Sequence, residues 1–199
     1  MTTKQKIQKK IKRTIKKMEA EEKDFGFIND GRGDRYVVSE WYLQISDYLG
    51  ILDYYQWFYK KFPDDIGFPE LQIAWIIAAI KKQRRSIRNK HLIQLENMNS
   101  YLLPMLLNQP YTRVDKWESM NISTEDYAEE IKREYQSYFD PETTAILKDL
   151  TSMERYVEFK EKCIALDVAL NDLRPGVKRT KAITDREKLE KAWLAWLEE

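Results

Sequence analysis

The stretch from residue 36 to residue 75 restricts the fold more than any other part of the chain. It carries Tyr, Trp or Phe at twelve positions, nearly half of all the aromatic residues, and its apolar residues recur at the three- and four-residue spacing of an α-helix. Large rings bury substantial area, so this block predicts the densest part of a core. No segment has the period-two alternation of a half-buried strand, and the sequence therefore predicts an all-α protein.

Composition excludes several classes of protein. One cysteine cannot form an internal disulfide, and one cysteine with one histidine cannot build an ordinary zinc site. The sequence has neither a G-x-G-x-x-G nor a G-x-x-x-x-G-K-[ST] motif for binding phosphates. The basic first residues lack the apolar core of a signal peptide, and the apolar run at 71–80 is too short to span a bilayer. We expect a cytoplasmic protein with no membrane span, metal or cofactor.

We predict a single all-α domain over residues 1–199. A basic amphipathic helix occupies residues 1–23, a pair of repeat-like hairpins residues 34–100, and further helices residues 122–199. The predicted helices are 3–22, 34–47, 50–62, 69–82, 85–97, a short turn near 102–107, 124–139, 141–150, 152–172 and 185–198. Short linkers between the helices of 34–97 favour antiparallel neighbours.

Side chains that can cap helices set several of these boundaries. Asp34 ends the glycine-rich loop 24–34 and is the predicted N-cap of the next helix. Thr151 with Glu154 forms a predicted capping box at the start of 152–172. Asp64 and Asp65 lie in a turn, and we interpret them as caps of the following helix rather than metal ligands.

The chain is nearly neutral, but its charges are unevenly placed. Eight of its 34 basic residues lie within residues 1–17, where there is no acidic residue, so the remainder of the chain is acidic. Ile7, Ile11, Ile15 and Met18 form one narrow apolar stripe along the same segment. Three interpretations stay open: this helix docks on the body, remains an exposed arm, or contacts nucleic acid or a membrane.

Residues 34–65 carry small and aromatic residues in a recognisable order. The positions that match are Ser39, Tyr42, Tyr48, Tyr55 and the closing Pro63. Through them the segment resembles a tetratricopeptide repeat, and residues 69–100 resemble a degenerate second unit with Gln83 in place of the turn glycine. Ile51 and Phe58 stand where that family prefers alanine. The resemblance implies a protein-binding scaffold of helical hairpins and supplies no site residues.

No group of residues predicts an enzyme. His91 is the only histidine and lies at helical spacing beside Leu92, which is more typical of a structural residue than of a catalytic one. Cys163 lies between Phe159 and Leu166 at core spacing, with nothing nearby in the sequence to make its thiolate reactive. We therefore expect no catalytic residues.

The predicted function is non-enzymatic protein recognition, by an adaptor or by an inhibitor such as an immunity protein. The partner is another protein of unspecified identity. The polar side chains expected on a groove between the second and fourth predicted helices are Arg35, Glu40, Gln44 and Gln72. The basic residues expected to add partner contacts are Lys82, Arg84, Arg85 and Arg88.

Two alternatives accompany this prediction. The N-terminal lysines and the basic turn at 81–90 could together follow the phosphates of a nucleic acid, with a second basic group at 174–181. The last helix, with Trp193 and Trp196, could pack on its own chain or pair with a second copy in a homodimer.

Overall fold

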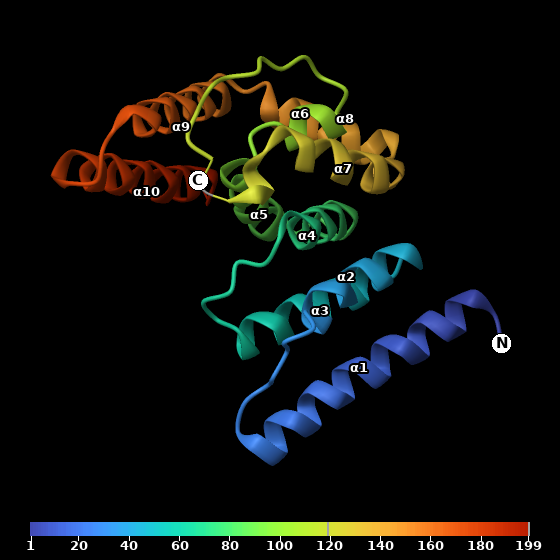
Figure 1. The fold of residues 1–199 in the computed structure, drawn as a ribbon. Helices are drawn as coiled ribbons and strands as arrows, with labels where there is room; N and C mark the ends of the chain where they lie inside the picture. The colour runs from blue at the N-terminus through green and yellow to red at the C-terminus, as the bar shows by residue number, and fades with distance from the viewer. Residues whose placement is uncertain (119, 199) are drawn as a thin grey trace. The chain divides into compact units, whose positions relative to one another are not determined.

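The computed structural model describes residues 1–118 and 120–198, without the side chains of residues 197 and 198. Every regular element in this part of the chain is a helix, which confirms the all-α class (Figure 1). The α-helices are α1 (Thr3–Phe25), α2 (Asp34–Gln44), α3 (Tyr48–Lys61), α4 (Pro69–Lys81), α5 (Arg85–Met98), α6 (Leu102–Leu106), α7 (Glu125–Tyr135), α8 (Pro141–Thr151), α9 (Glu154–Asp172) and α10 (Val177–Glu198). Single 3-10 turns cover Asn121–Ser123 and Gln136–Tyr138.

The chain folds into two compact units, Met1–Gln83 and Arg84–Glu199, called unit 1 and unit 2 below. Their boundary separates α4 from α5, the two helices predicted to form the hairpin at 69–100. The assignment of residues 1–199 to a single domain stays a prediction, as does the likeness to tetratricopeptide repeats.

Unit 1 is built around α2, which packs against α1, α3 and α4. The predicted aromatic core lies here, and Phe58 of α3 is at its centre with no exposed area. The ring of Phe58 has its centroid between 5.4 and 6.4 Å from those of Tyr36, Tyr54, Tyr59, Phe62 and Trp75. Offset and edge-on rings at such distances add to the area that they bury, so this cluster joins α2, α3 and α4.

The hairpin of α2 and α3 closes tightly at one glycine. A Cβ atom added to Gly50, in the first turn of α3, would lie only 2.4 Å from Cε1 of Tyr42 on α2. The ring of Tyr42 therefore occupies the space that any other side chain at position 50 would need. The close approach of the two helices depends on Gly50, while the positions where the repeat family prefers alanine carry Ile51 and Phe58.

Unit 2 brings the C-terminal helix back onto its own chain. Helix α10 packs against α9 and α5, and α6 packs against α7. The ring of Trp193 is buried, with its centroid 4.3 Å from that of Phe159 and 5.1 Å from that of Tyr156. Trp193, which the sequence made a candidate for a homodimer contact, therefore packs within its own unit.

Two predicted helix starts are wrong. Helix α10 begins at Val177 rather than at residue 185, and the Arg179 side chain donates to the carbonyl oxygens of Leu170 and Leu173 at 2.7 and 2.8 Å. These bonds satisfy carbonyl groups at the end of α9 and hold the first turn of α10 against it. Thr151 belongs to α8 and donates to the Lys148 carbonyl oxygen, so it does not cap α9.

The apolar run at 71–80 forms most of α4, and every one of its residues is buried. No helix in the described part of the chain combines the length and the apolar character needed to cross a bilayer, in agreement with the predicted lack of a membrane span.

We predict that the effect of Gly50→Ala on stability changes sign with the residue at position 42. With Tyr42 present, the added methyl group overpacks the hairpin and lowers the free energy of unfolding by about 1 kcal/mol, after the better helix propensity of alanine is included. In a Tyr42→Ala background the same change raises it by about 0.5 kcal/mol, because the methyl group meets open space. Urea unfolding of the four proteins measures both effects, and the same sign in both backgrounds would contradict the proposed contact.

Candidate recognition surface

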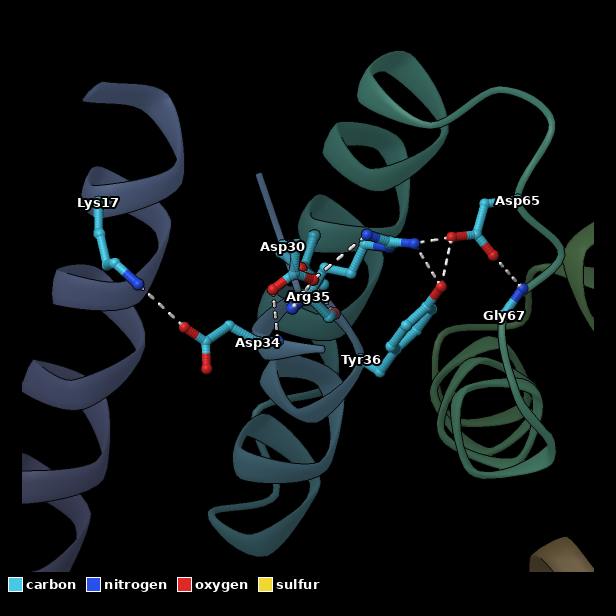
Figure 2. A network of polar contacts seen from close by, with 8 residues as sticks. Lys17, Asp30, Asp34, Arg35, Tyr36, Asp65 and Gly67 are labelled. Carbon is cyan, nitrogen blue, oxygen red and sulfur yellow. Dashed lines mark hydrogen bonds and ion pairs between the residues drawn. The ribbon is translucent and has the colours of Figure 1, made fainter. Parts of the chain in front are cut away.

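A polar network in unit 1 is centred on Arg35, at the start of α2. Its Nε lies 2.9 Å from Oδ2 of Asp65, and its Nη1 lies 3.4 Å from Oδ2 of Asp30. Its Nη2 also donates to the hydroxyl of Tyr36 at 2.6 Å. Figure 2 shows the guanidinium between the two carboxylates, one from each of two loops. Arg35 therefore joins loop 26–33 to loop 62–68.

Asp30 caps α2 from outside the helix. Its carboxylate is 2% exposed and accepts the backbone N–H groups of Asp34 and Arg35, at 2.6 and 2.9 Å. A carboxylate at this place satisfies the free donors of the helix end and complements the helix dipole. The predicted cap, Asp34, is instead the first residue of α2 and lies 3.4 Å from Nζ of Lys17 on α1.

Asp65 also has a different role from the predicted one. It accepts the Tyr36 hydroxyl at 2.7 Å and the backbone N–H of Gly67 at 2.8 Å. Helix α4 begins after Phe68 without a side-chain cap. Asp65 therefore holds loop 62–68 to α2, and it does not cap α4.

The pKa values of two groups in the network are shifted. Burial raises the pKa of Tyr36, and its hydrogen bond to Asp65 raises it further. Burial lowers the pKa of Arg35, but Tyr36 and Asp65 outweigh that effect, so the pKa is raised overall. Arg35 therefore stays charged and Tyr36 stays neutral at physiological pH.

Several large apolar side chains are exposed at the end of α1 and on the two loops that Arg35 connects. The Lys61–Glu22 ion pair joins the ends of α3 and α1 there, beside the two loops that Arg35 connects. The exposed side chains are Phe25, Phe27, Ile66 and Phe68, with 69, 62, 50 and 41% of their surface accessible. We call these four residues the loop-end surface. Exposed apolar side chains of this size are available for contact with a partner.

Helix α1 docks on the body and turns a basic face outward. Ile11 and Met18 are buried, and Nζ of Lys10 lies 3.7 Å from the centre of the Trp41 ring. This confirms the docking interpretation of the predicted apolar stripe. The outward cations, which form no ion pair with any described residue, are Lys4, Lys6, Lys9, Lys12, Arg13 and Lys16. We call them the basic face.

The polar residues predicted for a groove do not lie together as a free surface. Arg35 is engaged in the network, while Glu40 accepts a hydrogen bond from Gln44 at 2.9 Å on the outside of α2. Gln72 has no exposed area, and its amide donates to the carbonyl oxygen of Ile66. The prediction that Gln72 contacts a partner is therefore wrong, because its side chain is buried and holds loop 62–68 onto α4.

The predicted basic turn is divided between the two units. Lys82 follows α4 in unit 1, whereas Arg84 and Arg85 open unit 2. These three side chains are exposed. Arg88 is half-buried and donates to Oδ1 of Asn89 at 2.7 and 2.9 Å. The second basic group, at 174–181, is partly engaged, since Arg179 binds the end of α9 and Lys181 pairs with Asp185.

His91 and Cys163 are both buried. Burial and the charge of Lys90 lower the pKa of His91 to about 3, and burial raises the pKa of Cys163 to about 12. Both groups are neutral at physiological pH, which favours their structural interpretation. The described residues include no group of three or more His, Cys, Asp or Glu side chains that could hold a metal ion.

Sequence reasoning missed the loop-end surface and the two carboxylates that support it. The signal for the surface is the pair of phenylalanines on either side of Gly26, inside a loop otherwise rich in glycine and aspartate. The contact of Asp65 with Arg35 has no such signal, since it joins residues that are 30 positions apart, whereas Asp30 lies only five residues before Arg35. No known protein family matches the chain, and neither does any curated protein or solved structure.

We predict that two adjacent aspartates differ sharply in their contribution to stability. Asp65→Ala removes charge-assisted hydrogen bonds to Arg35 and Tyr36 and lowers the free energy of unfolding by about 2 kcal/mol. Asp64→Ala is the matched control, because Asp64 is exposed and its replacement changes stability by less than about 0.5 kcal/mol. Urea unfolding measures the difference, and equal effects would show that the network contributes nothing.

Proposed function

We propose that the protein is a non-enzymatic recognition module that binds an acidic protein partner through unit 1. The basic face of α1 attracts and orients the partner, and the loop-end surface supplies apolar anchors at the other end of the same helix. Charged surfaces of this kind raise association rates, while buried aromatic contacts supply most of the affinity. Adaptor and inhibitor roles are both forms of this activity.

The observation that carries the proposal is the unfavourable placement of charge along α1. Lys4 lies in its first turn, where the helix dipole disfavours a cation by about 0.3–1 kcal/mol, and Lys6 follows in the next turn. Lys9 with Arg13 and Lys12 with Lys16 are like-charge pairs at i,i+4, which destabilise a helix. Neither helix stability nor docking explains these cations, since docking uses Ile11 and Met18. An acidic partner would explain them.

The apolar end favours a protein over a simple polyanion. Phe25 and Phe27 follow the last turn of α1, and the ring of Phe68 packs edge-on against Tyr36 with centroids 4.7 Å apart. Arg35 and its carboxylates hold the two loops that carry most of these residues. Exposed apolar side chains at one end of a basic helix are complementary to a partner that offers both acidic and apolar side chains.

We predict that binding and stability respond in opposite directions to Lys9→Glu/Lys12→Glu. Each replacement turns a repulsive pair into a Glu–Arg or Glu–Lys pair at i,i+4, so the free energy of unfolding rises by a few tenths of a kcal/mol, roughly 0.2–0.5 per pair. The variant should no longer bind acidic partners, because two of the cations of the basic face have become acidic. Selection from a displayed random-peptide library should enrich Asp, Glu and large apolar residues on the wild type, and no acidic residues on the variant.

Two further proteins complete this test. Arg174→Glu/Lys178→Glu makes the same change in charge at exposed positions of unit 2 and should leave the acidic enrichment intact. Phe25→Ser/Phe27→Ser should keep the acidic preference but lose the apolar one. A wild type that enriches no acidic peptides, or a Lys9→Glu/Lys12→Glu variant that enriches them equally, would contradict the proposal.

Nucleic-acid binding is the second candidate function, favoured by the same unpaired cations of α1. Phosphate contacts would make the affinity for an oligonucleotide fall steeply with salt. The logarithm of the association constant would fall with the logarithm of the salt concentration, with a slope of about −0.9 per neutralised phosphate for a duplex and about −0.7 for a single strand. Fluorescence anisotropy with labelled DNA and RNA measures that slope. Tight binding lost in Lys9→Glu/Lys12→Glu, without any peptide enrichment on the wild type, would favour this function over protein recognition.

A further inference from the structure

Unit 2 contains a long irregular segment, residues 107–118, that side-chain and backbone hydrogen bonds fasten to the surrounding helices. The backbone N–H of Trp117 donates to the Asp167 carbonyl oxygen at 3.0 Å, and the hydroxyl of Tyr101 donates to the Val114 carbonyl oxygen at 3.0 Å. Asn171 on α9 also donates to Oδ1 of Asp115 at 3.0 Å. These bonds fix the backbone on both sides of Lys116.

Two of the cavities that Lys116 lines share a wall. One has a volume of about 210 Å³ and a mixed polar and apolar lining that includes Glu96, Asp167 and Arg186. The other has a volume of about 260 Å³ and a mainly apolar lining that includes Tyr101 and Tyr111. Both are entirely within unit 2. The wall that they share is formed by Ser100, Lys116, Lys160 and Ile164.

The buried charged residues of the described chain gather around the polar cavity. In the described part of the chain, three charged residues are buried when backbone and side chain are counted together: Glu96, Lys116 and Asp167. All three line the polar cavity. Glu96 pairs with Lys160 at 2.8 Å and accepts the Tyr156 hydroxyl at 2.7 Å. Asp167 pairs with Arg186 at 2.7 Å. These two acids are therefore compensated.

Lys116 is the exception. It is 8% exposed, and no described residue forms an ion pair or a hydrogen bond with its ammonium group. Its Nζ instead lies 4.9 Å from the centre of the Tyr101 ring. Burial lowers the pKa of Lys116, and the more distant Asp167 and Glu118 carboxylates only partly offset this effect. A buried cation without an acceptor is costly, and such groups commonly mark functional sites.

We infer that the apolar cavity of unit 2 binds a small aromatic carboxylate, whose charged group pairs with Lys116 and whose ring packs against Tyr101 and Tyr111. The two tyrosines already form an edge-on pair, with centroids 5.9 Å apart, in the lining of the cavity. Tyr111 is 39% exposed, so a ligand ring can reach it from solvent. One unpaired ammonium balances one negative charge, which favours a carboxylate over a phosphate dianion.

The volume limits the size of the ligand. An apolar cavity of about 150 Å³ holds benzene, so about 260 Å³ accommodates one ring with a short acidic chain. A nucleotide or a long-chain lipid exceeds that space. The inference concerns unit 2 alone and does not depend on the proposed recognition of a protein by unit 1.

The test is calorimetric titration of the full chain with 3-phenylpropanoate, benzoate and indole-3-acetate. At least one should bind with a Kd of about 1 mM or tighter. Acetate and inorganic phosphate should bind much more weakly, because they lack the ring or match the lining poorly. The neutral analogue 3-phenylpropanamide should lose at least about tenfold in affinity relative to its acid.

Lys116→Met keeps the length of the side chain and removes its charge. The fold should tolerate this change, because an apolar residue replaces an unpaired buried cation. The affinity for the carboxylate should fall by about tenfold or more, to the level of the amide. Lys178→Met, at an exposed position that lines neither cavity, is the matched control and should bind normally.

Three results would each overturn the inference. The first is no heat of binding for any of the three acids up to about 10 mM with the folded wild type. The second is equal binding of the acid to the wild type and to a folded Lys116→Met. The third is equal affinity for the acid and its amide.

Discussion

The contacts of Arg35 with Asp30 and Asp65 connect two loops of unit 1, loop 26–33 and loop 62–68. One guanidinium holds the loop after α1 and the loop after α3 against the start of α2. Its planar geometry suits this task, since a fork of fixed donors can meet two carboxylates and a phenol at once. Together with the bond from Gln72 to the Ile66 carbonyl oxygen, these contacts hold the loops that present the exposed phenylalanines, so the proposed apolar anchors depend in part on this polar network.

The two units treat charge differently. Unit 1 buries no whole Asp, Glu, Lys or Arg residue among those described, and it exposes a row of cations that repel one another along α1. Unit 2 buries three charged residues around one cavity, pairs two of them, and leaves Lys116 beside a tyrosine ring. Charges kept at a cost to stability are better explained by ligands than by folding, and the two arrangements point to ligands of very different size.

Much of the fold could be read from local pattern. The spacing of apolar residues located the helices of unit 1 to within a few residues, because helical periodicity is a property of adjacent turns. Caps were less predictable. Asp34 looked like an N-cap, yet Asp30 takes that role, because loop 26–33 folds back over the helix end. The start of α10 was misplaced because Arg179 stabilises an earlier turn through contacts with α9.

The sequence by itself determined that the protein is all-α, that its aromatic block is a core, and that its N-terminal helix is amphipathic and basic. These properties follow from short-range periodicity and composition. Only the tertiary structure decided which charges are paired and which are not. Arg35 binds one carboxylate five residues before it and another 30 residues after it, Gln72 is buried, and Lys116 has no acceptor among the described residues. Each outcome depends on how the chain folds back on itself. For that reason the helices could be predicted from the sequence, whereas the candidate sites could be identified only in the folded structure.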